Sequence, residues 1–263
     1  MYDFAYHRPT NLADAARLAK EAEAKLMAGG MTLIPTLKQR LAKPSAVIDL
    51  GAISDLVGIR VEGGRLTIGA LTTHADVARS AEVRRTIPGL ADLANGIGDP
   101  QVRNRGTIGG SLANNDPAAD YPAAVLGLGA TIQTNERSIA ADDYFKGLFE
   151  TALKEGEIIT AVHFPIPEKA AYAKFPNPAS RYAIIGVFIA KGPQGVRVAV
   201  TGAGNGVFRV KAMEDALAKN WSADAINDIT VPASECNSDI HASSEYRAHL
   251  IGVMAKRAIQ AAG

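Results

Sequence analysis

Cysteine is almost absent from this sequence of 263 residues, which contains only Cys236. A single thiol excludes a disulfide within the chain, and it cannot supply the four thiolates that hold an iron–sulfur cluster. Any such cluster that works with this chain must lie on another polypeptide. The five histidines show no paired spacing of metal ligands, so we expect no metal site.

The sequence also lacks long apolar runs and an excess of either charge. No apolar stretch is long enough to cross a bilayer, and the N-terminus carries Asp3, His7 and Arg8 in place of a basic head and an apolar signal core. We therefore expect a cytoplasmic chain with no integral membrane segment. With 28 basic and 27 acidic residues, the net charge is +1, and nothing in the composition favours nucleic acid as a partner.

Common catalytic signatures are missing as well. The chain contains no G-x-S-x-G nucleophile elbow and no Walker lysine, so we assign no catalytic residue. Residues 198–207 lead a predicted strand into glycines, as a dinucleotide-binding fingerprint does. Val207 stands where that fingerprint requires its third glycine, and the segment therefore predicts a structural turn.

Two glycine-rich turns are the most informative features present. Residues 28–32 read Ala-Gly-Gly-Met-Thr, and residues 106–111 read Gly-Thr-Ile-Gly-Gly-Ser. Glycine permits positive φ and close approach of a ligand to the backbone, and each turn also contains hydroxyl residues. A pair of glycines usually forms only a tight turn, but two such turns together are able to grip one diphosphate.

The hydrophobic pattern predicts mixed helices and strands without a long βαβ alternation, which is typical of α+β domains. The expected helices are 11–24, 35–40, a segment from Thr72 or Thr73 to Ser80, 83–97 with a break at Pro88, 141–145, Lys211–Lys219 and Ser244–Ala262. The expected strands are 25–28, 47–50, 56–60, Arg65–Gly69, Thr131–Thr134, 158–164, 181–190 and 196–201. Prolines at alternate positions in 165–169 predict an extended linker. These elements divide the chain into domains 1–55, 56–165 and 170–263.

Several ordered motifs resemble one protein family over nearly the whole chain. They are AGGMTLIP, VIDL, IGALTTH, PQVRNRGTIGGSLANNDPAADYPAA, GEII, PASRYA and the terminal EYR. On these motifs the sequence resembles the FAD-binding medium subunit of molybdenum hydroxylases. The likeness is greatest to the aerobic carbon monoxide dehydrogenase group, and the flavin domain of xanthine dehydrogenase is a more distant relative.

The resemblance implies the FAD-binding fold of the vanillyl-alcohol oxidase type, with two α+β subdomains, followed by a C-terminal α/β domain of the CO dehydrogenase flavoprotein type. It implies a first diphosphate loop, a second diphosphate loop, an acceptor carboxylate near the ribityl or diphosphate region, and contacts around the isoalloxazine ring. The first loop is Leu26, Met27, Ala28, Gly29, Gly30, Met31, Thr32 and Leu33, and the second is Thr107, Ile108, Gly109, Gly110 and Ser111. The acceptor carboxylate is Asp120, and the contacts around the ring are Ile97, Ile159, Lys174 and Tyr182. Met31 departs from the family pattern, in which many relatives carry a polar residue, so the role of its side chain is left open.

The function implied by the resemblance is electron transfer through FAD. A large subunit with a molybdenum cofactor and a small subunit with [2Fe-2S] clusters are the implied partners, assembled as a dimer of heterotrimers, and the acceptor is a quinone, NAD or another molecule. Two alternatives remain open at this point. One is a free-standing FAD-dependent oxidoreductase of the same fold, and the other is a cofactor-free scaffold subunit in which the glycine turns are only structural.

Overall fold

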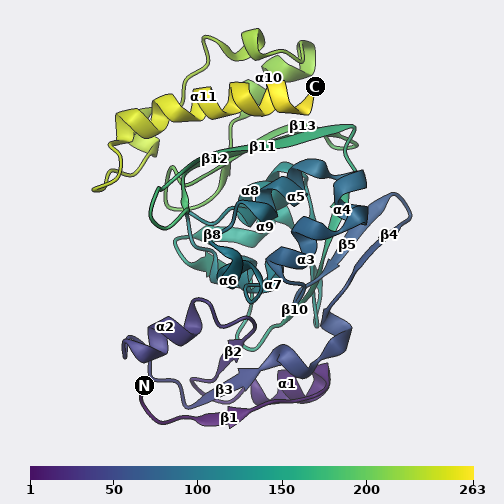
Figure 1. The fold of residues 1–263 in the computed structure, drawn as a ribbon, viewed down its shortest axis with the longest axis vertical. Helices are drawn as coiled ribbons and strands as arrows, with labels where there is room; N and C mark the ends of the chain where they lie inside the picture. Colours follow the sequence, from purple (N-terminus) through teal and green to yellow (C-terminus); the bar gives the residue numbers. More distant parts are fainter.

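The chain folds around three main β-sheets that follow one another along the long axis of the molecule (Figure 1). The computed structural model describes residues 1–263. The N-terminal sheet lies at one end of this axis and the C-terminal helices lie at the other, so the two termini are far apart (Figure 1). No helix combines the length and the apolar character needed to cross a membrane.

The first sheet is parallel and has the strand order β1-β3-β2. Its elements are β1 (Ala5–His7), α1 (Leu12–Leu18), β2 (Lys25–Met27), α2 (Leu33–Lys38) and β3 (Ala46–Asp49). Helix α1 begins at the Asn11 cap, whose side chain accepts from the backbone N–H of Asp14. The prediction that this helix reaches residue 24 is wrong. Glu23 takes a positive φ of 61°, and its carbonyl accepts from Ser45, which aligns β2 with β3 at the expense of helix.

The second sheet is antiparallel, in the order β4-β5-β10-β6-β7. Its strands are β4 (Ile59–Glu62), β5 (Arg65–Gly69), β6 (Thr131–Thr134), β7 (Ser138–Ala140) and β10 (Ile159–Pro165), and a separate hairpin joins β8 (Phe145–Gly147) to β9 (Glu150–Thr151). Each sheet and the helices packed on it form one unit of the chain. The prediction of a strand over 56–60 is wrong at its start. Leu56 ends a 3-10 turn, is 3% exposed and packs in the core of the first unit. Gly58, with φ 134°, separates this turn from β4.

Seven short helices surround this second sheet. They are α3 (His74–Arg79), α4 (Ala81–Thr86), α5 (Pro88–Asn95), α6 (Pro100–Arg103), α7 (Ile108–Asn114), α8 (Tyr121–Gly127) and α9 (Ala141–Tyr144). The predicted break at Pro88 is confirmed, because α4 ends at Thr86 and α5 begins at the proline. Helices α6, α7 and α8 were not predicted. Helix α7 contains Gly109 and Gly110, which lower its helix propensity, whereas α8 has Pro122 in its first turn, where proline is tolerated, and is buried along its whole length.

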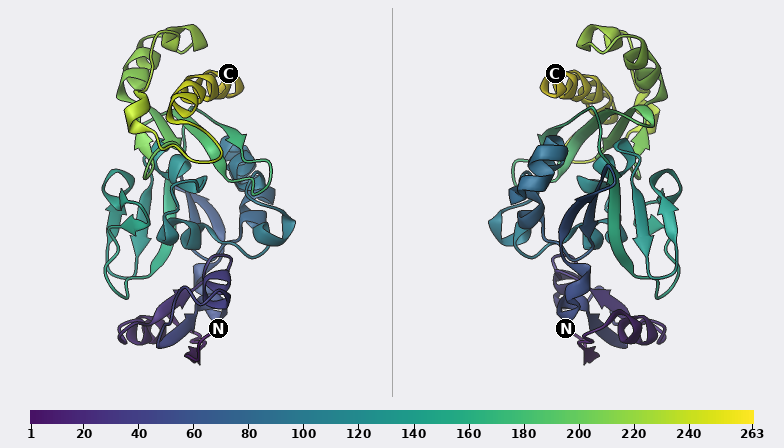
Figure 2. Two further views of the ribbon diagram at one scale, coloured as in Figure 1. Left: turned by 90° about the vertical axis from the view of Figure 1, so that its left-hand side faces the viewer. Right: turned by 90° about the vertical axis from the view of Figure 1, so that its right-hand side faces the viewer.

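The third sheet carries both long C-terminal helices on one face. It comprises β11 (Lys169–Pro176), β12 (Ala183–Gly192), β13 (Gly195–Thr201) and β14 (Phe208–Arg209), with α10 (Lys211–Lys219) and α11 (Ser244–Ala262) outside it (Figure 2). Both predicted helices are confirmed to the residue. Strand β11 was missed, because the predicted linker ran to Lys169; the connection between β10 and β11 is only residues 166–168.

Both faces of β12 are buried, which ties the third sheet to the second unit. Ile185, Val187 and Ile189 pack in the outer cluster with α11, whereas Phe188 joins the core of the second unit. A Cβ at Gly127 would lie 3.0 Å from the Phe188 ring, so α8 approaches this strand closely. We propose the division 1–55, 56–165 and 170–263 as domains whose cores share residues across the boundaries.

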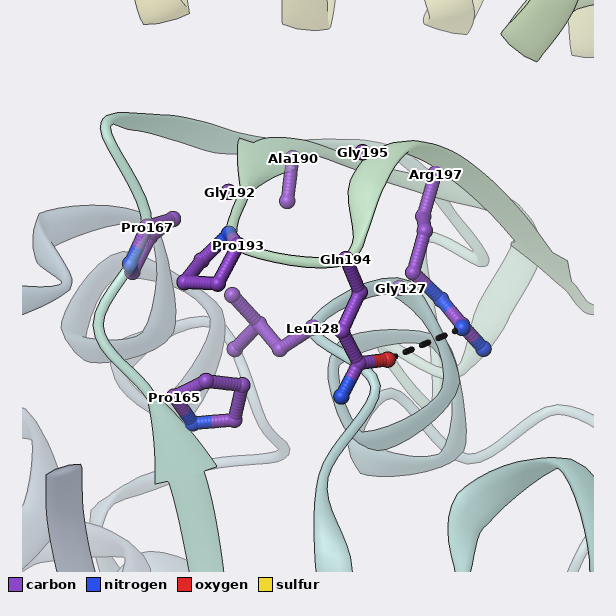
Figure 3. Close-up of a pocket in the computed structure, with 10 residues that line it drawn as sticks. All are labelled: Gly127, Leu128, Pro165, Pro167, Ala190, Gly192, Pro193, Gln194, Gly195 and Arg197. Carbon is purple, nitrogen blue, oxygen red and sulfur yellow. Dashed lines mark hydrogen bonds between the residues drawn. The ribbon is translucent and has the colours of Figure 1, made fainter.

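A buried arginine fixes the contact between the second and third units (Figure 3). Arg197 donates from Nε to the carbonyl of Leu126 at 2.8 Å, and its Nη2 makes bonds of 2.7 and 2.8 Å to the two carboxylate oxygens of Asp142. Gln194 donates to the carbonyl of Gly129 at 3.1 Å. The small cavity in this interface has a volume of about 10 Å³, which is enough for one water molecule.

Replacing Arg197 by methionine is therefore expected to destabilise the chain by about 2–3 kcal/mol, since the buried carbonyl of Leu126 loses its donor and Asp142 keeps only Arg209. Chemical denaturation by urea measures the change. The matched control is Lys191→Met, which removes an exposed ion pair with Glu168 and should change stability by less than about 0.5 kcal/mol. Equal effects of the two substitutions would show that Arg197 does not hold the interface.

Candidate functional site

A cavity of about 670 Å³ opens where the three units meet. This volume lies within the range of sites for cofactors and other small molecules. Its wall contains every predicted site residue except Ile108 and Lys174. The side chain of Ile108 is instead fully buried in the core of the second unit, and Lys174 lies one side chain behind the wall, against Asp120.

The first glycine turn presents a row of free backbone donors to this cavity. None of the backbone N–H groups of residues 28–33 donates a hydrogen bond to another group of the chain, although all six residues line the cavity. Gly30 has φ 75°, a conformation that glycine adopts without strain. Met31 is 38% exposed and contributes its backbone in the same row. Such a run of N–H groups attracts an anion.

The second glycine turn is arranged differently from the first. Thr107 caps α7, and its Oγ1 accepts from the N–H of Gly110 at 3.1 Å. The N–H groups of Ile108 and Gly109 donate to the carbonyls of Thr72 and Ala70 at 3.2 and 2.8 Å. Ser111 donates its N–H to the carbonyl of Thr107 within the helix. This turn therefore offers the cavity hydroxyl groups and a bare glycine surface rather than a row of free N–H groups.

The two turns are packed directly against each other. A Cβ at Gly29 would overlap the carbonyl oxygen of Arg105, and a Cβ at Gly110 would lie 3.5 Å from the Cβ of Ala28. Gly109 in turn allows α7 to approach Ala70, whose Cβ would lie 2.6 Å from an added Cβ. Glycine at these positions lets the first and second units form one continuous wall.

The carboxylate of Asp120 is already partnered within the chain. Lys174 Nζ lies 3.0 Å from one of its oxygens, and Tyr172 donates its hydroxyl to the same group. Burial raises the pKa of Asp120, and the Lys174 ammonium opposes that shift. Lys174 also donates to the carbonyl of Gly96 at 2.9 Å. Asp120 therefore links α8, α5 and β11 at the base of the cavity.

A short loop from the third unit closes one side of the cavity. The side chain of Asn177 accepts from the backbone N–H groups of Ala179 and Ser180, and this fixes the loop that carries Tyr182. Arg181 adopts φ 63° and donates to the carbonyl of Gly98 at 3.1 Å. Tyr182 is 46% exposed, and its pKa is raised by burial and by nearby Asp116 and Asp120. Ile97 and Ile159 also line the cavity and contribute apolar surface to its wall.

Several polar residues of the wall were not singled out from the sequence. They are Lys25, Thr36, His74, Asn114, Asp116, Glu157, Ser180 and Arg181. The carboxylate of Glu157 accepts hydrogen bonds from Arg137, Thr134 and the backbone N–H of Lys154. These bonds lower the pKa of Glu157 to about 2 despite its burial. The sequence provided only an indirect signal for these residues, because six of them lie within motifs that carried the resemblance: His74, Asn114, Asp116, Glu157, Ser180 and Arg181. No group of three or more His, Cys, Asp or Glu side chains is arranged to hold a metal ion.

The two halves of the chain match two known domain families. Residues 2–167 match the FAD binding domain in molybdopterin dehydrogenase, and residues 170–262 match the CO dehydrogenase flavoprotein C-terminal domain. The sequence is 36% identical to the carbon monoxide dehydrogenase medium chain of Afipia carboxidovorans, over 98% of this chain and 96% of that one. It is 35% identical to the nicotine 6-hydroxylase medium subunit of Paenarthrobacter nicotinovorans, with the same coverage.

Solved structures agree with the sequence matches. Reconstituted CO dehydrogenase from Oligotropha carboxidovorans contains a chain that superposes with a TM-score of 0.89 at 35% identity, covering 99% of this chain and 98% of that one. Quinoline 2-oxidoreductase from Pseudomonas putida 86 gives a TM-score of 0.88 at 30% identity, covering 99% and 97%. The similarity therefore extends over the whole fold that forms the cavity.

Burial of His74 in the cavity wall predicts a pH dependence of stability. Burial, with a smaller effect of Arg103, lowers the pKa of His74 from 6.5 to about 4. The unfolded chain therefore binds a proton that the folded chain excludes, and stability falls as the pH drops from 6.5 towards 4. Between pH 7 and pH 5 the loss from this group is about 2 kcal/mol.

Urea unfolding of the wild type and of the His74→Gln variant at both pH values isolates this contribution, because all other titrating groups are shared. The variant should lose less stability than the wild type between pH 7 and pH 5. An identical loss in both proteins would show that His74 titrates normally in the folded chain.

Proposed function

The chain belongs to the FAD-binding medium subunits of the molybdenum hydroxylases, and from this membership we propose that it transfers electrons between partner subunits and an external acceptor. It is a subunit of an oxidoreductase, and its FAD-binding domain covers residues 2–167. The observation that carries the proposal is the row of six residues with free backbone N–H groups that lines a cavity of cofactor size.

The residues present fit FAD. A diphosphate is an anion, and the free N–H groups of residues 28–33 are neutral donors that stabilise it without a buried counter-charge. The hydroxyls of Thr107 and Ser111 face it from the second turn, next to the bare surface of Gly110. These donors hold the diphosphate between the first and second units of the chain.

The remaining site residues orient the rest of the cofactor. Ile97 and Ile159 provide apolar surface for the isoalloxazine ring, and Tyr182 borders it from the loop of the third unit. Asp120 and Lys174 act as a pair, since the lysine neutralises the carboxylate and fixes its direction at the wall. The wider set assigned to FAD binding is Leu26, Met27, Ala28, Gly29, Gly30, Met31, Thr32, Leu33, Ile97, Thr107, Gly109, Gly110, Ser111, Asp120, Ile159, Lys174 and Tyr182, with Ile108 supporting the second turn from the core.

When bound, FAD supplies exchange between one-electron and two-electron chemistry, and the protein supplies its position and surroundings. We propose that a large partner with a molybdenum cofactor oxidises the substrate, and that a small partner with [2Fe-2S] clusters delivers the electrons to this chain. A quinone, NAD or another acceptor takes them up. The complex is proposed to be a cytoplasmic dimer of heterotrimers, and no residue of this chain acts as a general acid or base.

The row of free donors favours an anion-binding site over a scaffold that holds no cofactor, because successive free N–H groups in a turn attract an anion. A free-standing flavoenzyme remains the competing function. It differs in one measurable property, since it would oxidise its own substrate without partners.

The first functional prediction is that each chain binds one FAD without a covalent bond. Acid precipitation of the protein purified from its native host should release the flavin into the supernatant as the dinucleotide, because only non-covalent contacts hold it. Flavin that stays in the precipitate, or release of the mononucleotide, would contradict this expectation.

The second glycine turn gives a sharper prediction. Gly110→Val places a branched side chain between the turns, with its Cβ 2.9 Å from Thr107 Oγ1 and 3.5 Å from the Cβ of Ala28, and should weaken FAD binding at least about tenfold. Fluorescence titration measures affinity and circular dichroism monitors the fold. Gly252→Val is the matched control, because Gly252 is also helical but has nothing near its added Cβ. Equal affinity of both variants would remove the second turn from the site.

The need for partners is tested by native purification. The chain should copurify with two other kinds of subunit, and the complex should contain molybdenum and iron, because Cys236 alone cannot hold a cluster. The isolated chain should show little activity on purines, aldehydes or carbon monoxide. Recovery of the chain alone, free of both metals and fully active on a natural substrate, would favour the free-standing enzyme.

A further inference from the structure

His74 occupies a fixed position beside the second glycine turn. It is the first residue of α3, directly after the Thr73 cap, and its backbone N–H donates to the carbonyl of Gly106 at 3.0 Å. Its imidazole lies over Gly106, where an added Cβ would come within 2.5 Å of Nε2. The absence of a side chain at Gly106 therefore lets the ring reach the cavity wall, which includes both residues.

The imidazole has no hydrogen-bond partner within the chain. His74 is only 5% exposed, and its Nδ1 is completely buried without a partner. Nε2 also makes no bond but keeps some exposed surface, so it is the nitrogen that a molecule in the cavity reaches. Buried polar groups in folded proteins almost always have partners, and an exception calls for an explanation.

The surroundings of the ring determine its charge. Burial and the nearby Arg103 guanidinium hold the pKa of His74 at about 4, so the ring is neutral near pH 7 and has one N–H and one acceptor nitrogen. The Tyr121 ring lies 5.3 Å away, and its hydroxyl is also buried without a partner. Donation from the cavity side requires the tautomer in which the proton is on Nε2.

We propose that His74 donates a hydrogen bond from Nε2 to a diphosphate oxygen of the bound cofactor. The proposal rests on the proposed function and adds a side-chain donor to the second turn, whose own N–H groups are mostly occupied by Thr107, Thr72 and Ala70. A neutral donor suits this position, because a fixed positive charge would have to be buried whenever the site is vacated.

The test is titration of FAD into the native complex after the flavin has been removed. His74→Ala should weaken FAD binding by about tenfold or more, since it removes one donor to a charged group. His74→Gln should retain most of the affinity, because its amide N–H extends to the position of Nε2. The matched control is His163→Gln, a partly buried histidine whose Nδ1 is paired with Thr67 outside the cavity.

ADP as a competitor identifies which part of the cofactor is contacted. It carries the diphosphate without the flavin, so its binding should weaken in His74→Ala by the same factor as that of FAD. A loss for FAD alone would overturn the diphosphate assignment, and unchanged affinity for both ligands would overturn the role of His74 altogether. Failure of the wild-type complex to bind FAD would instead contradict the proposed function. If His74→Ala does not fold, His74→Gln carries the test. A loss of FAD affinity of about tenfold in His74→Gln would then contradict the proposal, because this variant keeps an N–H donor.

Discussion

The close approach of Gly29 to the carbonyl of Arg105 is the constraint on which the cavity depends. It brings a turn from a parallel sheet of the first unit against a helix cap of the second, with no side chain between them. Once the turns meet in this way, their chemical roles separate. The first turn keeps its N–H groups free, while the second uses its own to anchor α7 to Ala70 and Thr72. The site therefore consists of one donor row and one hydroxyl-bearing wall.

The third unit is held to this wall by buried polar contacts rather than by apolar packing alone. Arg197 joins β13 to the end of α8 and to Asp142, and Asp120 joins the start of α8 to Lys174 on β11. Helix α8 is thus fixed at both ends by residues of the third sheet. Because the third sheet is attached to α8 in this way, the loop that carries Tyr182 has a fixed position. A segment distant in sequence from the glycine turns therefore reaches the same cavity.

Sequence patterns predicted elements whose residues follow their own propensities. Lys211–Lys219 and Ser244–Ala262 are amphipathic and match the structure, as does Arg65–Gly69. Helix α7 escaped prediction because Gly109 and Gly110 lower its helix propensity, and α8 because a short, fully buried run shows no amphipathic period. The site residues came from motifs, but which N–H groups remain free depends on distant acceptors such as Thr72. His74 was dismissed as a metal ligand, and only its burial reveals an unpaired ring.

The central claim is that a cofactor diphosphate lies between the two glycine turns and accepts hydrogen bonds chiefly from residues 28–33. A crystal structure of the protein with FAD bound tests this claim most directly. The account predicts phosphate oxygens within hydrogen-bond distance of several of these backbone N–H groups, with Thr107 or Ser111 on the opposite side. A diphosphate found outside the turns, with the N–H groups of residues 28–33 still unpaired, would contradict it.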